Sequence, residues 1–188
     1  MTDVLIRPAH AFDAAFCVPL IQATIGRIGH ALAGTTDDVA AARTMLGFYP
    51  LRGNRLSFEH QLIAQAPSGE PLGVILAYPG DHAEALDDPF RERLRALGLP
   101  GHVESEGTSG ELYVDTLAVT ETARGRGIGG RLLDAAATRA AALGLDRVGL
   151  LVEDGNPAAR LYVRQNFRPA GRRHLAGGVY RYLVRDLT

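Results

Sequence analysis

The stretch that most constrains this chain is residues 111–130, which read ELYVDTLAVTETARGRGIGG. Apolar and β-favouring residues fill positions 112–119, a short polar segment follows, and glycines and arginines then open an alanine-rich segment with the apolar spacing of a helix. These patterns predict a strand, a loop and a helix in direct succession.

The glycine-arginine run is suited to holding an anion at the start of the helix. Glycine has no Cβ and lets a ligand approach the main chain, while the first N–H groups of a helix lack intrahelical partners and lie at the positive end of its macrodipole. Arg124, Arg126 and Arg131 add side-chain charge at the same place. We therefore expect a phosphate-bearing ligand here.

The spacing of this run narrows the choice of ligand. It fits the pattern Arg/Gln-x-x-Gly-x-Gly/Ala at Arg124, Gly127 and Gly129, and with the preceding strand it resembles the coenzyme A signature of the GNAT superfamily of N-acyltransferases. The resemblance covers about residues 72–187. A second motif of that superfamily is similar to Asn156, Ala159, Leu161, Tyr162 and Phe167, with Asn166 where its glycine usually stands.

The resemblance implies one domain spanning residues 1–188 with an α/β (α+β) GNAT fold. In that fold a single mixed, mostly antiparallel sheet of about six or seven strands carries helices on both faces, and the fourth and fifth strands splay apart. The residues predict an insertion at 80–110 with a short helix that Asp88 caps and Gly98 ends. Other expected elements are strands at 4–7, 58–66, 72–78 and 146–152, helices at 11–25 and 37–46 with a mobile connection at 26–34, and a hairpin at 168–187.

The resemblance also implies that acetyl-CoA is the cosubstrate and that its pantetheine arm lies between the splayed strands. The arm would pair with the backbone near Leu117 and Val119, and an N–H there would polarise the thioester carbonyl in the manner of an oxyanion hole. The cofactor-binding residues expected from the resemblance are Leu117, Ala118, Val119, Arg124, Gly125, Arg126, Gly127, Ile128, Gly129, Gly130, Asn156 and Tyr162.

An amine nucleophile with a pKa of about 10 must lose a proton before it attacks. Period two predicts that Glu111, Tyr113, Asp115, Leu117 and Val119 share one face of the strand, and the resemblance implies a carboxylate base at Asp115, with Glu111 as the second candidate. A carboxylate with a pKa near 4 is about six units too acidic for direct transfer, so Asp115 is expected to act through water or to orient the amine. A hydrogen-bonded carboxylate on the cleft wall is the alternative.

Tyr162 matches the tyrosine that faces the departing sulfur in the superfamily. Proton transfer from a phenol with a pKa near 10 to a thiolate near 8.5 is uphill by about 2 kcal/mol, so a hydrogen bond to the developing thiolate is the expected role. A helix-face aromatic packed beside Leu161 is the alternative for this residue.

Two nucleotide-binding patterns compete for the same glycines. Gly125, Gly127 and Gly130 satisfy the dinucleotide fingerprint G-x-G-x-x-G, but residues 120–124 separate the first glycine from the strand and the remaining chain has room for one parallel strand. The phosphate loop of NTPases fails because Arg131 stands where that motif has lysine. The first hypothesis is therefore an N-acetyltransferase, and the alternatives are a non-catalytic acyl-CoA-sensing module and a nicotinamide-dependent oxidoreductase.

Composition narrows the classes of partner. The formal net charge of −1 gives no global attraction to nucleic acid or to an anionic membrane, so neither is expected. The single cysteine, Cys17, and an N-terminal segment that reads as a strand predict a cytoplasmic protein. Six histidines without metal-ligand spacing predict no metal. The expected acceptor is a primary amine of an unidentified small molecule, peptide or protein, and the resemblance is compatible with a homodimer.

Overall fold

The computed structural model describes residues 4–187, and across them the strands form one mixed sheet in the order β1-β2-β3-β4-β5-β7-β6. Each neighbouring pair is antiparallel except β4 and β5, which run parallel. The predicted mixed, mostly antiparallel sheet is confirmed, and it differs from the parallel sheet of a dinucleotide-binding unit. Residues 1–3, which belong to the N-terminal segment that reads as a strand, lie outside the described residues. The strands are β1 (Leu5–Pro8), β2 (Gln61–Gln65), β3 (Pro71–Pro79), β4 (Glu111–Val119), β5 (Arg147–Glu153), β6 (Arg168–Leu175) and β7 (Gly178–Asp186).

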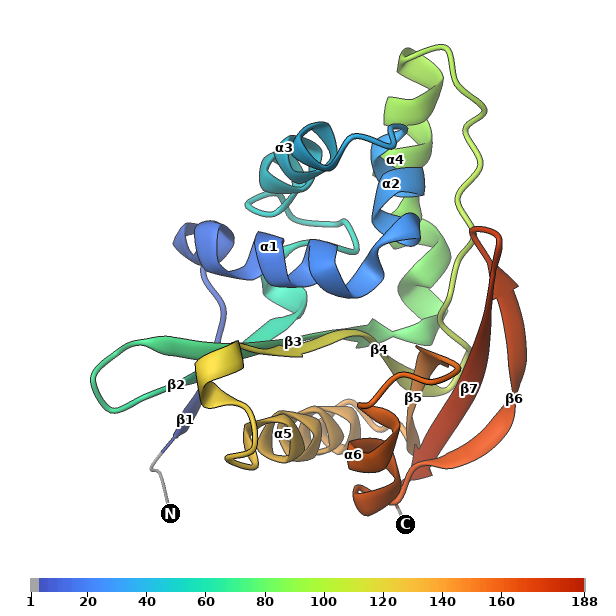
Figure 1. Ribbon diagram of the computed structural model, residues 1–188. Helices are drawn as coiled ribbons and strands as arrows, with labels where there is room; N and C mark the ends of the chain where they lie inside the picture. The colour runs from blue at the N-terminus through green and yellow to red at the C-terminus, as the bar shows by residue number, and fades with distance from the viewer. Residues whose placement is uncertain (1–3, 188) are drawn as a thin grey trace.

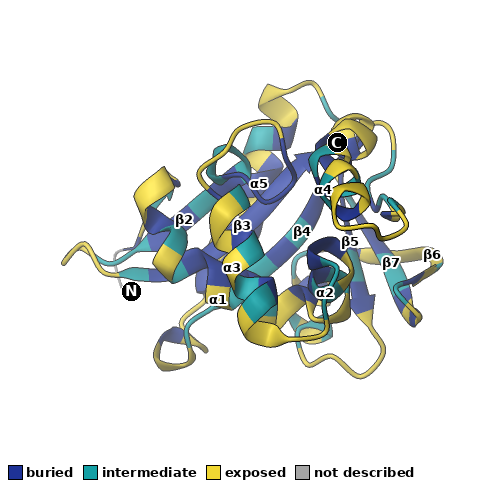
Figure 2. Ribbon diagram, turned by 90° about the horizontal axis from the view of Figure 1, so that it is seen from above, coloured by how far each residue is buried: buried dark blue, intermediate teal, exposed yellow. Residues whose placement is uncertain are grey.

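Helices cover both faces of this sheet, with α1 to α4 on one side and α5 and α6 on the other (Figure 1). Each layer packs on its own hydrophobic cluster, one containing Ile21 and Phe90 and the other containing Leu132 and Val148. Figure 2 shows the central strands buried beneath the first layer. The helices are α1 (Ala14–Ile25), α2 (Arg27–Ala33), α3 (Asp38–Phe48), α4 (Ala83–Ala96), α5 (Ile128–Ala142) and α6 (Ala159–Arg164).

Helix α5 and the start of α3 agree with the sequence. Ile128, Leu132 and Ala136 of α5 are buried, as the 3.6-residue period predicts. The side chain of Asp37 accepts a hydrogen bond from Ala40 N at 2.7 Å and so caps α3.

Helix α4 corrects one prediction. It begins at Ala83 rather than after Asp88, and Pro89 lies inside it. Proline has no N–H and cannot donate the helical hydrogen bond to the carbonyl four residues earlier, so that carbonyl lacks its usual partner within the helix. The neighbouring carbonyl of Leu86 accepts from Arg55 N at 3.1 Å, which ties the loop before β2 to this turn of α4.

The glycine-rich connection at 26–34, expected to be mobile, folds as helix α2. A Cβ on Gly29 would lie 2.5 Å from Met45 Cε, so this glycine allows α2 to pack closely on α3. The helix expected at 11–25 begins three residues later, at Ala14, and ahead of it Phe12 lies in a 3-10 turn and is 78% exposed.

A β-bulge in β4 overturns the prediction that five of its residues share one face. Leu76 pairs with Thr116 while Ala77 pairs with Val114, so Asp115 has no partner on β3. One extra residue inverts the alternation of side chains. Glu111 and Tyr113 lie before the inversion, and Leu117 and Val119 lie after it. Tyr113 therefore packs in the cluster under α1 to α4, whereas Leu117 and Val119 pack against the cluster under α5.

Strands β4 and β5 separate directly beside this bulge. Their parallel pairing runs from Glu111 with Arg147 to Val114 with Leu150 and then stops, although both strands continue. The predicted splay is therefore present, and it leaves one edge of β4 without a strand partner from Asp115 to Val119.

Among residues 4–187, no single helix is long and apolar enough to cross a bilayer; Ala11–Ile25 and Arg27–Ala33, bent by 113° at their junction, meet the length and hydropathy criteria only as a pair.

Candidate functional site

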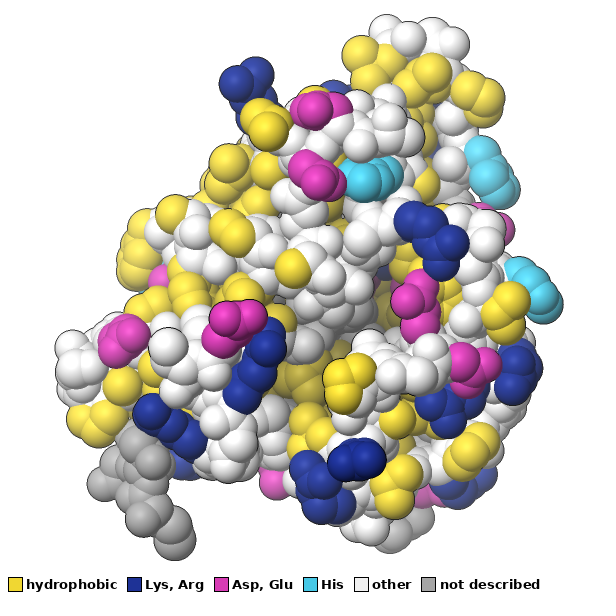
Figure 3. All heavy atoms as spheres, in the orientation of Figure 1, with side chains coloured by type: hydrophobic (Ala, Val, Ile, Leu, Met, Phe, Trp, Pro, Cys, Tyr) yellow, Lys and Arg dark blue, Asp and Glu magenta, His cyan; other side chains and the backbone are white. Residues whose placement is uncertain are grey.

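Two cavities open where β4 and β5 part. The loop cavity, about 690 Å³, lies against the glycine-rich turn at the start of α5, and the splay cavity, about 550 Å³, lies between the two strands. Figure 3 shows this face of the molecule hollowed between the upper helical layer and the C-terminal hairpin. The two cavities are adjacent because they share the lining residues Ala23, Thr24, Leu117, Asn156 and Ala158.

The glycines of the loop cavity divide into two kinds. Gly125 and Gly127 have φ of +76° and +78° with open space around them, so they shape the turn and leave the backbone accessible to a ligand. A Cβ on Gly129 or Gly130 would come within 2.8 Å of Leu161 or Gln165, so these two allow α6 to pack on α5. Free N–H groups of the first turn of α5 therefore face a cavity of ligand size.

The structure brings most of the predicted cofactor residues to the loop cavity. Arg124 lines it, and its Nε donates to Val119 O at 3.3 Å, whereas Arg126 is not among the lining residues. Tyr162 lines the splay cavity instead. The predicted residues that line the loop cavity are Leu117, Ala118, Val119, Arg124, Gly125, Gly127, Ile128, Gly129, Gly130 and Asn156.

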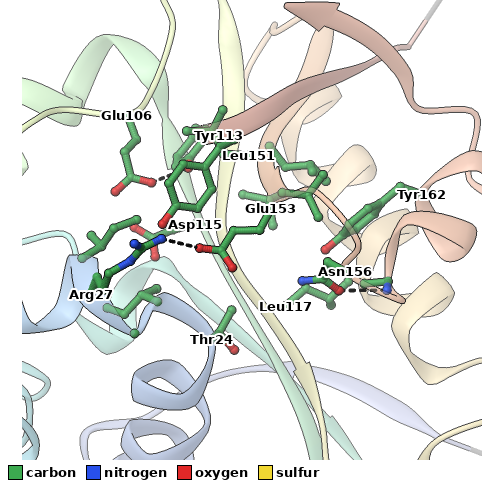
Figure 4. A pocket seen from close by; sticks show the side chains of 18 of the residues that line it. Thr24, Arg27, Glu106, Tyr113, Asp115, Leu117, Leu151, Glu153, Asn156 and Tyr162 are labelled. Atoms are coloured by element: carbon green, nitrogen blue, oxygen red, sulfur yellow. Dashed lines mark hydrogen bonds and ion pairs between the residues drawn. The ribbon is translucent and has the colours of Figure 1, made fainter. Parts of the chain in front are cut away.

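Tyr162 projects from α6 into the splay cavity, where its hydroxyl lies near Asn156 (Figure 4). Its ring packs edge-on against Phe167 with centroids 5.8 Å apart, and burial raises the pKa of the phenol to about 12. The hydroxyl therefore stays protonated at neutral pH and is available as a hydrogen-bond donor. Asn156 Oδ1 accepts from Ala158 N at 2.9 Å, which forms the turn that leads into α6.

Asp115 lines the splay cavity, but its carboxylate is tied to other side chains. The side chain is fully buried, and Oδ2 accepts from Arg55 Nε at 3.0 Å, from Arg55 Nη2 at 2.5 Å and from Tyr78 OH at 3.0 Å. Three hydrogen bonds to one oxygen leave that oxygen no free lone pair for the ammonium group of an acceptor. The geometry thus favours the hydrogen-bonded alternative for Asp115 over the base.

Glu111, the second predicted base, does not line either cavity. Its carboxylate accepts from Thr108 N at 2.9 Å and from Tyr182 OH. It packs over β5, where a Cβ on Gly149 would come within 2.1 Å of Glu111 Oε2. Glu111 lies at the start of β4, where β4 is still paired with β5, so it stands away from the opening between the two strands.

Glu106 and the pair Arg27–Glu153 also line the splay cavity. The sequence patterns did not single out Glu106 or Arg27 as functional, and they gave Glu153 only as a possible ribose-binding acid in the dinucleotide alternative. Arg27 Nη2 lies 3.0 Å from Glu153 Oε1, with both side chains about half exposed. Glu106 is buried, and burial raises the pKa of its carboxyl group. It stands in a polar segment with no periodic pattern, so no spacing rule could have identified it.

Among the described residues, no group of three or more His, Cys, Asp or Glu side chains is arranged to hold a metal ion.

Comparisons with known proteins agree with this geometry. The family model described as the acetyltransferase (GNAT) family matches residues 37–167. A solved structure described as an acetyltransferase is 29% identical, with 98% of this chain and 100% of that chain covered and a TM-score of 0.73. An N-acetyltransferase from Staphylococcus aureus Mu50 is 20% identical, with 96% and 100% covered and a TM-score of 0.75; at this identity the likeness shows a shared fold.

A curated relative, the mycothiol acetyltransferase of Corynebacterium aurimucosum, is 46% identical over 70 residues. The match covers 37% of this chain and 22% of the relative, so it spans about a fifth of that relative's length.

Proposed function

Because this chain belongs to the acetyltransferase (GNAT) family, we propose that it binds acetyl-CoA in the loop cavity and transfers the acetyl group directly to a primary amine in the splay cavity. The observation that carries the proposal is the meeting of the two cavities at the unpaired edge of β4. A cofactor held in the first cavity can present its thioester to an acceptor held in the second.

The chain offers a separate contact for each part of the cofactor. The first turn of α5 holds the pyrophosphate with backbone N–H groups, and Arg124 adds positive charge beside it. The unpaired edge of β4 receives the pantetheine arm, and an N–H of Leu117 or Val119 polarises the thioester carbonyl. Leu117 lines both cavities, so the reacting carbonyl belongs at this residue.

Tyr162 supports departure of the sulfur. With a pKa of about 12, the phenol donates a hydrogen bond to the developing thiolate more readily than it gives up its proton. The amine nitrogen forms the new bond to the acetyl carbon, the carbon–sulfur bond breaks, and the thiolate leaves as coenzyme A once it has taken a proton. No covalent enzyme intermediate is needed.

Calorimetric titration with acetyl-CoA, desulfo-CoA and NADH tests the cofactor half of the proposal. Gly127→Glu is expected to abolish binding of both CoA ligands, because it places a carboxylate at the phosphate site. Gly144→Glu is the matched control: φ is +74° there and +78° at Gly127, both sites are open, and Gly144 lies at the other end of α5. Binding of NADH in place of CoA would contradict the proposal and favour the oxidoreductase.

A panel of amines tests the transfer half. Acetyl-CoA consumption is followed with a primary alkylamine, an arylalkylamine, a polyamine, an amino acid and a peptide N-terminus. Acetylation of at least one class is expected. Tight CoA binding without transfer to any of them would favour the non-catalytic sensing module.

A further inference from the structure

Glu106 brings an acidic group from the 80–110 segment into the splay cavity, where 4% of its side chain is exposed. Figure 4 shows its carboxyl group turned toward Tyr113, across the cavity from Tyr162. We propose that Glu106 binds the ammonium form of the acceptor and takes its proton, an inference that rests on the acetyl transfer proposed above.

Two donors hold the Glu106 carboxylate without saturating it. Tyr113 OH donates to Oε2 at 2.6 Å, and Arg55 Nη2 donates to Oε1. A carboxylate oxygen has two lone pairs, so each keeps one for a further donor. Asp115 differs, because its Oδ2 already accepts three hydrogen bonds and its Oδ1 accepts one from Thr116. Of these two carboxylates on the cavity wall, Glu106 has more capacity for an ammonium group.

The charges behind Glu106 favour a cation in the cavity. The fully buried Arg55 pairs with Asp87, Glu106 and Asp115, and Arg91 adds a second positive charge beside Asp87, so two positive charges face three carboxyl groups. Buried negative charge without a counterion is costly, and burial raises the pKa of both Glu106 and Asp87. A proton or an ammonium group at Glu106 reduces this imbalance. A raised carboxyl pKa also lies closer to that of an amine, which makes proton transfer less unfavourable.

The backbone around Glu106 is held on two sides, so a loop residue keeps a fixed position. Arg173 of β6 donates to Glu106 O at 2.6 Å. Gly107 crosses Gly80 so closely that a Cβ on it would lie 2.7 Å from Gly80 Cα, and a Cβ on Gly80 would lie 1.8 Å from Thr108 O. Such fixed placement is what a proton acceptor needs.

The proton balance of the reaction is complete with Glu106 as acceptor. The ammonium gives one proton to the Glu106 carboxylate, and the freed lone pair forms the bond to the acetyl carbon. The carbon–sulfur electron pair leaves on sulfur, which takes the second proton from the nitrogen and departs as a thiol. The carboxyl group then releases its proton to solvent, so amide, coenzyme A and one proton are formed.

Glu106 and Ile28 line a further cavity of about 200 Å³, and both residues also line the splay cavity, so the two cavities are adjacent. Since a water molecule fills about 30 Å³, this space has room for a short water path to carry the proton away. The charged and titratable groups that face Glu106 or line the two cavities beside it are Arg27, Arg55, Tyr78, Asp87, His102, Glu104, Tyr113, Asp115, Glu153, Tyr162, Arg173 (through the backbone) and Tyr180.

The first test uses n-butylamine as a probe, titrated at neutral pH into the protein saturated with coenzyme A. The wild-type complex is expected to bind butylammonium and Glu106→Gln to bind it at least tenfold more weakly, with unchanged affinity for coenzyme A. Glu92→Gln, which makes the same charge change on an exposed position of α4, is the control and is expected to behave as wild type. Retained CoA binding shows that the variant is folded.

The second test is the pH profile of kcat/KM with whichever amine of the panel is acetylated. A base must be deprotonated, so the rate of the wild type rises as pH rises through the raised pKa of Glu106. Glu106→Gln is expected to lose this limb together with at least tenfold in kcat, and Glu106→Asp to keep the limb at a reduced rate.

If the wild-type complex fails to bind butylammonium, or if Glu106→Gln binds it equally well, the inference is overturned whether or not an acetylated amine is known. An acid limb that persists in Glu106→Gln would also overturn it. Failure of the wild type to bind coenzyme A would instead refute the proposed function.

Discussion

Tyr162 combines packing and chemistry in one side chain, because its ring packs on Phe167 while its hydroxyl reaches the splay cavity. Tyr162→Phe is expected to lower kcat by roughly 10- to 100-fold, since a donor to the departing sulfur is lost, while the Kd of acetyl-CoA changes little. Steady-state kinetics and calorimetry measure the two effects separately. Tyr49→Phe, which removes a buried hydroxyl from the opposite helical layer, is the control. Unchanged turnover would remove Tyr162 from the mechanism.

His60 makes the stability of the protein depend on pH. Burial lowers the pKa of its imidazole to about 4, with Glu59 acting in the opposite direction. The unfolded chain binds this proton near pH 6.5, so the stabilisation is complete above that pH and is lost as pH falls toward about 4, by at most about 3 kcal/mol.

Urea unfolding at several pH values measures this loss, and His60→Phe is expected to flatten the decline between pH 6.5 and 4. His10→Phe replaces an exposed ring and is expected to leave the decline in place. A variant of His60 that declines as steeply as wild type would show that another group is responsible.

At the level of single residues, the sequence predicted the cofactor side better than the acceptor side. Gly125 and Gly127 stand where the backbone needs a positive φ, and this requirement is visible in the sequence as glycine. The structure shows a positive φ at both residues. No such requirement marks Asp115 or Glu106 in the sequence. Which carboxylate is paired and which keeps free lone pairs depends on Arg55, about fifty to sixty positions away along the chain.

At the level of elements, regular periodicity was predictable and its interruptions were not. Helix α5 buries its apolar stripe from Ile128 to Ala140, and only Leu143, just past its end, is exposed against expectation. The bulge at Asp115 changes the face of every later residue in β4, yet it depends on pairing with β3 and leaves no mark in the sequence. Helix α4 was misplaced because the sequence Asp88-Pro89 is typical of a helix start, whereas packing carries the helix through the proline.

The close crossing of residues 80 and 107 gives a testable consequence at the same scale. Gly80→Ala is expected to destabilise the protein by roughly 1–3 kcal/mol and to displace the segment that carries Glu106, because the new Cβ would overlap Thr108 O. Hydrogen exchange of residues 98–110 and acetyl transfer both report the displacement. Gly47→Ala, in open space on α3, is the matched control. Native protection of the segment in Gly80→Ala would contradict this packing role.

At the level of the whole molecule, the loop cavity joins both helical layers. Leu20 and Ala23 of α1 line it from one side of the sheet, and α5 and α6 line it from the other. Acetyl-CoA at about 100 times its Kd is therefore expected to stabilise the folded state by about 2.7 kcal/mol and to raise Tm by roughly 5–10 °C. Differential scanning calorimetry measures the shift. Gly127→Glu is expected to show no shift, and an equal shift there would place the ligand elsewhere.

We propose that residues 1–188 form one domain, because a single sheet carries both hydrophobic clusters. The cytoplasmic location and the homodimer stay predictions, which fractionation and sedimentation can test.

The two cavities are lined by residues from distant parts of the chain, and this determines at which stage of folding a binding site can form. Thr24 and Asn156 line both cavities although most of the chain separates them, and Arg27 reaches Glu153 across 126 positions. Closing loops of this length is entropically costly and slow. A nascent or truncated chain that lacks β5 and α6 has no cofactor groove, however well its N-terminal helices have formed. Recovery of cofactor binding during refolding thus marks the closing of long loops that join the first helices to the C-terminal part of the chain.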